Sequence, residues 1–386
     1  MNVYERIGAV RVVNAVGPAT RFGGVPLSAG VLTAMSEATA VAIDIEQLQL
    51  TAGRHLAGLL GVPGAYVTPG ASAALLLGTA AALTRTEARL IDALPTVLGT
   101  RDTVVVQAAH RDPYDHAITA TGARLVEVGY PGTTRAGEVA RALDERTAAV
   151  LYRPGRPGEH VGLRELADLA HRAGAVVIVD GALHVPPVDR LHEYFEQGAD
   201  LVAVSGGKCF RGPQASGLLL GDPALLTAAA LHHQDMDVRD ATWGRRPGRD
   251  GGGAPRQGIG RSLKLGREQL LGLVVAVEEY LAGTSADALG EAELAVVAER
   301  LAAAGTTATW HHDPALDVRN LEVPLPETGA DDLLVRLAGR PVPVFVEEGT
   351  AWRGVLALNP MALVEGDGAI LADALLEELA RSGRPA

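Results

Sequence analysis

Six short apolar segments separated by helical patterns constrain the fold of this 386-residue chain. Strands are predicted at 103–107, 124–128, 148–152, 175–179, 201–204 and 216–220. Helices are predicted at 71–83, 138–143, 163–172 and 189–197. Near-continuous apolar strands that alternate with amphipathic helices are typical of a parallel sheet covered on both faces. We therefore expect an α/β fold in which ligands bind at the carboxyl ends of the strands.

The length favours a large domain followed by a smaller one. Residues 243–260 are polar and rich in Gly and Pro, which predicts a loop long enough to be an active-site lid. A long helical pattern follows at 267–281. We expect three parts: an N-terminal segment (1–25) that packs on the small domain, a large domain (26–265) and a small C-terminal α/β domain (266–386).

Composition excludes several classes of protein. A hydrophobic fraction of 47% with 21% charged residues indicates a soluble globular protein. The net charge of −12 argues against an extended nucleic-acid surface. Cys209 is the single cysteine, so internal disulfides are excluded and a cysteine-based zinc site is disfavoured. The sequence starts without an apolar signal region and has no long uncharged apolar stretch, so we expect a cytoplasmic protein with no membrane partner.

A lysine and an aspartate follow two of the predicted strands. Lys208 comes after the strand 201–204, through Ser205-Gly206-Gly207, and Asp180 directly follows the strand 175–179. A lysine amine forms a Schiff base with an aldehyde, and a carboxylate can hold a pyridine nitrogen protonated. Either residue alone is more typical of a surface loop, but the two are the protein groups that pyridoxal 5'-phosphate (PLP) most needs. Together they favour a PLP site.

A phosphate site is predicted where Thr68-Pro-Gly-Ala-Ser72 opens a helix. Small residues let backbone N–H groups approach an anion, and the helix N-terminus attracts it. Ser205 is a second candidate phosphate ligand, although its hydroxyl could equally satisfy the end of a strand. The segment could also be an ordinary turn. The phosphate-site interpretation is favoured because about a hundred residues separate the segment from Asp180, which leaves room for several βα units between the two contacts.

A histidine and several cations complete the candidate site. His110 follows the strand 103–107, where an imidazole can stack on a pyridine ring and relay a proton. A metal site is not expected there, because no third ligand stands at helical spacing and a proline breaks the local helix. Four cations could bind an anionic substrate: Arg21, Arg211, Arg261 and Lys264. Each of them could instead be a solvated surface charge.

These residues stand within motifs that occur in a specific order. The motifs are Asn14-Ala-Val-Gly17, Thr20-Arg-Phe-Gly-Gly24, Val67-Thr-Pro-Gly-Ala-Ser72, His110-Arg-Asp-Pro-Tyr-Asp-His116, Val179-Asp-Gly-Ala-Leu-His184 and Ser205-Gly-Gly-Lys-Cys-Phe-Arg-Gly-Pro-Gln214. In this order they resemble the selenocysteine-synthase-like and D-glucosaminate-6-phosphate ammonia-lyase-like family of fold-type-I PLP-dependent enzymes. The resemblance extends to about residue 282 and is looser beyond it.

The resemblance implies an aminotransferase-like fold and PLP as cofactor. It also implies a homodimer or higher assembly, with small-molecule substrates bound at subunit interfaces. Lys208 would be the Schiff-base lysine and Asp180 the partner of the pyridine nitrogen. The further candidate contacts are Gly70, Ala71, Ser72, His110, Ala182 and Ser205 for the cofactor, and Arg21, Tyr114, Arg211 and Arg261 for the substrate.

Three positions depart from the family pattern, Cys209, His184 and Phe345. Phe345 stands where we would expect an arginine, which suggests a substrate other than a phosphorylated sugar acid. The acidic chain also starts directly with the catalytic unit, so we do not expect a tRNA-dependent activity.

The expected reaction is α,β-elimination on a small amino acid or amino-sugar acid, of the ammonia-lyase type. The alternatives are racemisation or epimerisation, in which His110, His184 or Cys209 would supply a second acid, and then transamination. A PLP-binding protein without turnover is a rival from another class. Nicotinamide binding is not expected, because no Gly-x-Gly-x-x-Gly follows the first strand.

Overall fold

The structure is a computed structural model that describes residues 3–156, 158–235, 237, 239–243, 256–284, 287–325 and 330–381. Its chain forms two compact units. The large unit consists of Ala29–Gly206 and Ala215–Glu278, and the small unit of Met1–Ser28, Gly207–Gln214 and Glu279–Ala386. Most of the helix α12 (Arg267–Leu281) belongs to the large unit, where Leu273 is fully buried next to Gly206.

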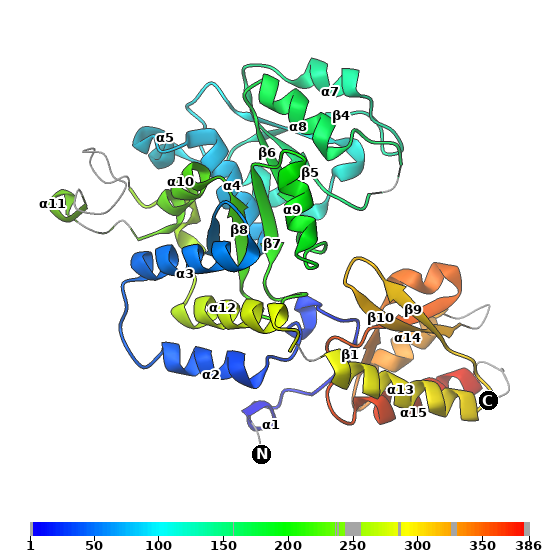
Figure 1. The fold of residues 1–386 in the computed structure, drawn as a ribbon. Helices are drawn as coiled ribbons and strands as arrows, with labels where there is room; N and C mark the ends of the chain where they lie inside the picture. Colours follow the sequence, from blue (N-terminus) through cyan, green and yellow to red (C-terminus); the bar gives the residue numbers. More distant parts are fainter. Residues whose placement is uncertain are drawn as a thin grey trace. The chain divides into compact units, whose positions relative to one another are not determined.

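A seven-stranded sheet forms the centre of the large unit (Figure 1). Its spatial order is β2 (Ala65–Thr68), β8 (Gly217–Gly221), β7 (Leu201–Ser205), β6 (Val176–Asp180), β5 (Thr147–Tyr152), β3 (Thr103–Gln107) and β4 (Arg124–Val128). The strand β8 is antiparallel to both of its neighbours, and the other six strands all point the same way. The six strands expected from the sequence are confirmed to within one residue at each end. The carboxyl ends of the six parallel strands therefore lie along one edge of the sheet.

Helices cover both faces of this sheet, as the right-handed crossover of parallel strands requires. The connections that move toward β4 place α4 (Ala71–Thr84) and α6 (His116–Thr119) on one face, where α10 (Pro223–His233) packs against α4. The connections that move back toward β2 place α7 (Ala136–Ala142), α8 (Leu163–Arg172) and α9 (Asp189–Glu196) on the other face. The two-sided cover explains why the strands are apolar on both faces.

The helix α4 is the most deeply buried helix next to the sheet. Its residues from Ala73 to Thr84 are buried apart from Leu76, and many of them are alanines. Leu75 and Leu77 belong to the same core cluster as Val104 and Ile178. Small side chains allow close packing of a helix that is surrounded by protein. The position of α4 fixes the backbone that leads into it at Gly70.

The remaining elements of the large unit flank the sheet. They are α2 (Ala29–Ala38), α3 (Ile45–Leu60), α5 (Ala88–Ala93), α11 (Asp240–Trp243) and the 3₁₀ turns η2 (Ala108–His110), η3 (Pro113–Asp115) and η4 (Ile259–Ser262). Residues 244–255, which form most of the predicted lid loop, lie outside the described residues.

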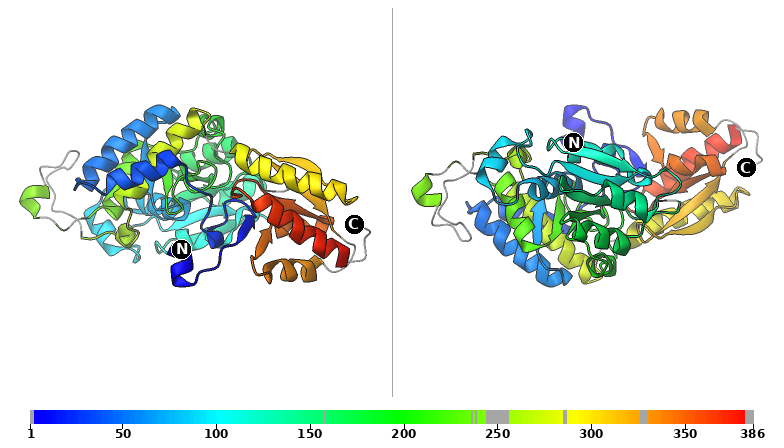
Figure 2. Two further views of the ribbon diagram at one scale, coloured as in Figure 1. Left: turned by 90° about the horizontal axis from the view of Figure 1, so that it is seen from below. Right: turned by 90° about the horizontal axis from the view of Figure 1, so that it is seen from above.

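The small unit contains two further sheets. One has the order β12 (Val355–Leu358), β10 (Val318–Pro324), β9 (Thr309–Asp313), and the other pairs β1 (Val13–Ala15) with β11 (Val344–Val346) in parallel. Its other elements are α1 (Val3–Ile7), α13 (Asp287–Ala303), α14 (Ala330–Ala338), α15 (Asp367–Arg381), η1 (Thr20–Phe22) and η5 (Glu348–Arg353). The helices α13 and α15 lie side by side (Figures 1 and 2). Val13 and Ala15 are fully buried in this core, so the N-terminal segment is part of the small unit.

Two glycines of α3 give a matched test of how closely this helix packs on β2. A Cβ atom on Gly53 would lie 2.4 Å from the carbonyl oxygen of Ala65, whereas a Cβ atom on Gly58 would meet nothing within 4 Å. Gly53→Ala should therefore destabilise the protein by about 1–3 kcal/mol, as overpacking does. Gly58→Ala should stabilise it by up to about 1 kcal/mol, because alanine is the better helix former. Thermal unfolding of the two variants measures this, and equal shifts in the same direction would contradict the packing.

Candidate active site

The shared carboxyl edge of the large sheet brings the candidate residues of four strands to one side of the unit. Gly70 follows β2, Ser205 ends β7, Asp180 ends β6 and His110 follows β3 in the turn η2. They are far apart in the sequence, and only the parallel arrangement of the strands places them along the same edge. This edge is where an α/β sheet binds its ligand.

The carboxylate of Asp180 is held from two sides. Its Oδ2 accepts a hydrogen bond from Nε of Arg153 at 2.9 Å, and its Oδ1 accepts one from the backbone N–H of Ala182 at 3.3 Å. The Asp180 side chain is only 12% exposed. The register pairs Asp180 with Ala203 of β7, and Lys208 is five residues further along the chain. These two hydrogen bonds therefore hold the carboxylate of Asp180 in one orientation.

Arg153 was not among the candidates from the sequence, although it lies at the centre of this network. It is 3% exposed, and its Nη1 donates to Oδ1 of Asp115 at 2.7 Å and to the carbonyl oxygen of His110 at 2.5 Å. Burial alone would lower the pKa of Arg153, but its hydrogen bonds to Asp115 and Asp180 raise the pKa above its ordinary value. Burial would raise the pKa of Asp115, but the hydrogen bonds from Arg111 and Arg153 lower it. The network is therefore a buried ion cluster with its charges paired.

His110 lies in the same network. Its ring is 1% exposed, its Nδ1 accepts a hydrogen bond from the backbone N–H of Arg153 at 3.2 Å, and its ring packs edge-on against those of Tyr152 and His160. Burial, together with nearby His160, Arg156 and Arg153, lowers the pKa of His110 to about 4. His110 is therefore neutral near pH 7, and its Nε2 carries the proton because Nδ1 accepts.

The entry into α4 has the close backbone approaches that suit an anion. Gly70 has a φ of +109°, and a Cβ atom on Gly217 of β8 would lie 2.6 Å from the carbonyl carbon of Gly70. Ser72 is exposed in the first turn of α4, and Gly70 has no side chain to cap the N–H groups of that turn. These donors point out of a long helix whose dipole also favours negative charge.

Lys208 lies on the loop Gly207–Gln214, which belongs to the small unit. A Cβ atom on Gly207 would lie 2.8 Å from Cα of Gln214, so the loop closes tightly on itself. The amide of Gln214 donates to Oγ1 of Thr20 at 2.9 Å, and both Nη atoms of Arg211 donate to the carbonyl oxygen of Met361. Contacts with the rest of the small unit thus hold the backbone on which Lys208 stands.

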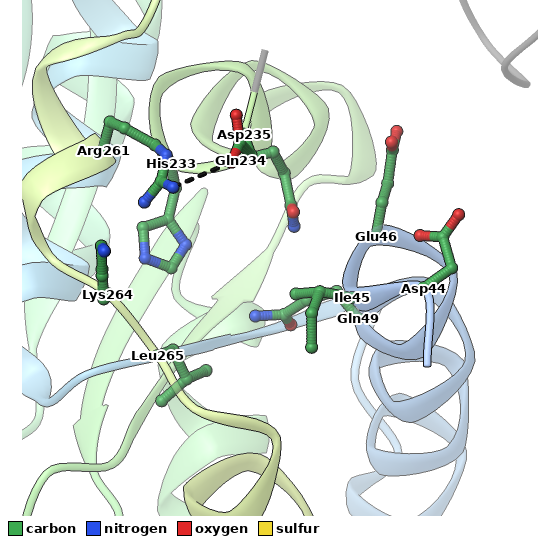
Figure 3. A pocket seen from close by; sticks show the side chains of 10 residues that line it. All are labelled: Asp44, Ile45, Glu46, Gln49, His233, Gln234, Asp235, Arg261, Lys264 and Leu265. Carbon is green, nitrogen blue, oxygen red and sulfur yellow. Dashed lines mark hydrogen bonds and ion pairs between the residues drawn. The ribbon is translucent and has the colours of Figure 1, made fainter. Parts of the chain in front are cut away.

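Arg261 lines a cavity of about 340 Å³ in the large unit (Figure 3). Lys264 lines the same cavity, and Asp44 and Glu46 face it from the start of α3. Arg261 pairs with Asp235 at 2.9 Å. Hydrogen bonds from the Asp237 backbone, Gln257 and Arg261 lower the pKa of Asp235 to about 2. The Arg261 guanidinium is therefore already held at the wall of the cavity.

The other candidate substrate residues lie elsewhere within their own units. In the large unit, Tyr114 is 59% exposed in the turn η3. In the small unit, Arg21 stacks over the ring of Phe22 and approaches Glu348 at 3.6 Å, and Phe22 packs against Phe345 with 4.4 Å between ring centroids. Arg211 is committed to its backbone hydrogen bonds. The side chain of Phe345 itself thus carries no charge, and the nearby positive charge is that of Arg21 on the other ring of the pair.

Comparisons with known proteins agree with this fold. Residues 84–247 match the family described as Aminotransferase class-V. The chain is 28% identical to D-glucosaminate-6-phosphate ammonia lyase of Salmonella typhimurium, over 97% of each chain. It is 33% identical to a 5'-C-glycyluridine monooxygenase-decarboxylase of a Streptomyces species, over 72% of this chain and 65% of the relative. A solved structure of a D-glucosaminate-6-phosphate ammonia-lyase matches all of both chains with a TM-score of 0.83 and 26% identity.

The fold and these likenesses define a fold-type-I PLP-dependent enzyme. Within that class, the chain is similar over nearly its whole length to D-glucosaminate-6-phosphate ammonia-lyase, in line with the resemblance of its motifs. The residues of the large unit fit PLP, because a fixed carboxylate, Asp180, and an uncapped helix start at Gly70 lie along one sheet edge. Lys208 is the residue expected to bind the aldehyde.

Two further findings concern the described residues alone. None of their helices has the length and apolar character needed to cross a membrane. No cluster of three or more His, Cys, Asp or Glu side chains that could hold a metal ion occurs among them.

The chain contains just two lysines, Lys208 and Lys264, which makes the Schiff-base assignment easy to test. Lys208→Ala should abolish the visible absorbance of the lysine-bound cofactor and lower turnover by several orders of magnitude, because it removes both the covalent anchor and the expected base. Lys264→Ala is the matched control and should keep the absorbance. Borohydride reduction followed by peptide mapping locates the label, and a label on Lys264 would overturn the assignment.

Proposed function

We propose that the protein is a PLP-dependent lyase that eliminates a β-substituent from a small amino acid or amino-sugar acid. The substrate loses its α-proton and its β leaving group, and hydrolysis of the product yields a 2-keto acid and ammonia. The observation that carries the proposal is the likeness to D-glucosaminate-6-phosphate ammonia-lyase over the whole chain, in sequence and in fold. Lys208, Asp180 and the start of α4 are all present in this chain, which favours an enzyme that turns over its substrate rather than a protein that only binds PLP.

The cofactor and three parts of the chain have separate roles in the proposed reaction. PLP, when bound, supplies the electron-withdrawing ring that acidifies the α-carbon of the substrate. Asp180 holds the proton on the pyridine nitrogen, and the N–H groups at the start of α4 bind the phosphate. Nζ of Lys208 would be the base that takes the α-proton. His110, neutral and buried, orients the network behind Asp180 and stays a candidate for a second proton donor.

The substrate proposed here carries a carboxylate and does not require a phosphate. Phe345 packs on Phe22 where the family pattern leads us to expect an arginine. An aromatic pair offers no charge to a phosphate, and it offers apolar area to a less polar group. Arg261 is the first choice for the substrate carboxylate because it lies on a cavity wall with Lys264, and Arg21 is the second.

We also propose that the protein acts as a homodimer or higher homo-oligomer. Large apolar side chains are exposed on and between α2 and α3, and they include Leu32 (53%), Val41 (65%) and Ile43 (49%). Exposed apolar area gathered on neighbouring residues is typical of a surface that another protein covers. The cytoplasmic location expected from the sequence stays a prediction.

Reaction type is tested by incubating the PLP-loaded enzyme with candidate substrates in D₂O. Ammonia release, exchange of the α-hydrogen and optical rotation are followed together, with D-glucosaminate and D-glucosaminate 6-phosphate compared directly. Elimination predicts ammonia with a 2-keto acid. Exchange and loss of rotation without ammonia would replace the lyase with a racemase or epimerase. The Streptomyces relative, named as a monooxygenase-decarboxylase, makes this check necessary because it differs in reaction.

Arg261→Ala tests the proposed carboxylate contact. Losing a charge-assisted bidentate contact in a desolvated site should cost about 2–4 kcal/mol of binding. The Michaelis constant should therefore rise sharply while the visible absorbance of the cofactor stays intact. Arg164→Ala, on the exposed side of α8, is the control and should change neither quantity. Unchanged kinetics in Arg261→Ala would move the assignment to Arg21.

A further inference from the structure

Charged side chains of alternating sign form a continuous chain that ends at Asp180. Arg111 donates from Nη1 to Glu127 of β4 and from Nε to Oδ2 of Asp115, both at 2.5 Å. Asp115 in turn accepts from Arg153 at 2.7 Å, and Arg153 donates to Asp180 at 2.9 Å. The chain crosses the carboxyl edge of the sheet from β4 to β6, and it passes from exposed to buried surroundings.

Geometry makes Arg153 the element that orients Asp180. The backbone of Arg153 follows β5, directly beside β6, and its N–H is bound to His110. Its Nε and Nη1 are committed to two different carboxylates, so the planar guanidinium fixes the direction of both. Nη2 is buried and makes no hydrogen bond with the described residues, so Nε alone joins Arg153 to Asp180. A lysine has a single nitrogen and cannot reproduce this fork.

Asp115 has a separate effect, because its negative charge offsets the positive charge of Arg153. Arg153 and Asp180 by themselves carry no net formal charge, so a buried pair of them would hold a pyridinium proton weakly. Asp115 adds one negative charge next to Arg153, and the whole chain of Glu127, Arg111, Asp115, Arg153 and Asp180 then keeps a formal net charge of −1. Charge interactions at these distances are strong when the groups are withdrawn from water.

We propose that Arg153 is a positioning residue that orients Asp180 toward the pyridine nitrogen of PLP, and that Asp115 offsets the charge of Arg153 so that Asp180 can keep this nitrogen protonated. The proposal rests on PLP as the cofactor and does not depend on the elimination reaction. It therefore survives if the reaction proves to be racemisation, and it is tested without any substrate.

The experiment uses the whole protein loaded with PLP that carries ¹⁵N in its ring. The ¹⁵N chemical shift separates a protonated pyridine nitrogen from an unprotonated one, and titration of the apoprotein gives the dissociation constant of PLP. The variants are Asp115→Asn, Arg153→Gln and Arg153→Lys. Asp180→Asn marks the shift expected for a lost proton. Arg124→Gln is the control, because Arg124 pairs with Asp102 at the opposite ends of the strands.

Asp115→Asn should move the ¹⁵N signal toward that of Asp180→Asn, because Arg153 then neutralises Asp180. Arg153→Gln should weaken PLP binding by about tenfold or more, as the loss of a charge-assisted hydrogen bond does. Arg153→Lys should recover part of that loss, because it restores the charge without the fork. Circular dichroism and thermal unfolding establish that each variant is folded.

An Asp115→Asn protein with the wild-type ¹⁵N shift would overturn the charge-balance part of the proposal. A folded Arg153→Gln protein with wild-type PLP affinity would overturn the positioning part. If Arg153→Gln does not fold, then Arg153→Lys decides, since a purely structural role would leave its PLP affinity unchanged. Failure of the wild-type protein to bind PLP would instead remove the cofactor assignment.

Discussion

Six strands that run in one direction are the constraint on which this site depends. Each parallel strand must return to the starting edge through a crossover, so every carboxyl end opens at the same edge. Gly70, His110, Asp180 and Ser205 are brought to that edge by hydrogen-bond ladders and by the burial of α4, with no direct interaction required between them. The site is therefore as rigid as the sheet, and its chemistry can change through the residues at the strand ends while the core stays the same.

A buried ion cluster at such an edge has an energetic cost. Removing an arginine and two carboxylates from water is unfavourable unless each charge finds partners. Arg153 meets this condition by donating to Asp115 at 2.7 Å and to Asp180 at 2.9 Å. Stability of the fold alone does not explain such a cluster, because a protein with apolar residues of similar volume in its place is often at least as stable. Its position next to Asp180, the carboxylate proposed to hold the pyridine nitrogen, gives a functional reason.

The sequence predicted the strands well because their signal is local. An uninterrupted apolar run flanked by polar residues identifies a buried strand, and the six predicted strands lie within one residue of those observed. The edge strand β2 was missed because it is short, and its Tyr66 and Thr68 interrupt the apolar run. Lys208 and Asp180 were proposed from the sequence because each directly follows or nearly follows a predicted strand. Arg153 has the same signal, since it comes immediately after β5, but a lone arginine at a loop start is usually a surface charge.

The pairing of Arg153 with Asp115 was beyond any local pattern. Asp115 lies in the turn η3 after β3, and Arg153 lies 38 residues later after β5. The two meet because β3 and β5 are neighbours in the sheet although β4 lies between them in sequence, at the edge of the sheet. Strand order is a property of the folded topology, so a contact between non-consecutive strands follows only once that order is known. The same strand order brings Tyr152, at the end of β5, and His160 edge-on against the ring of His110, which follows β3.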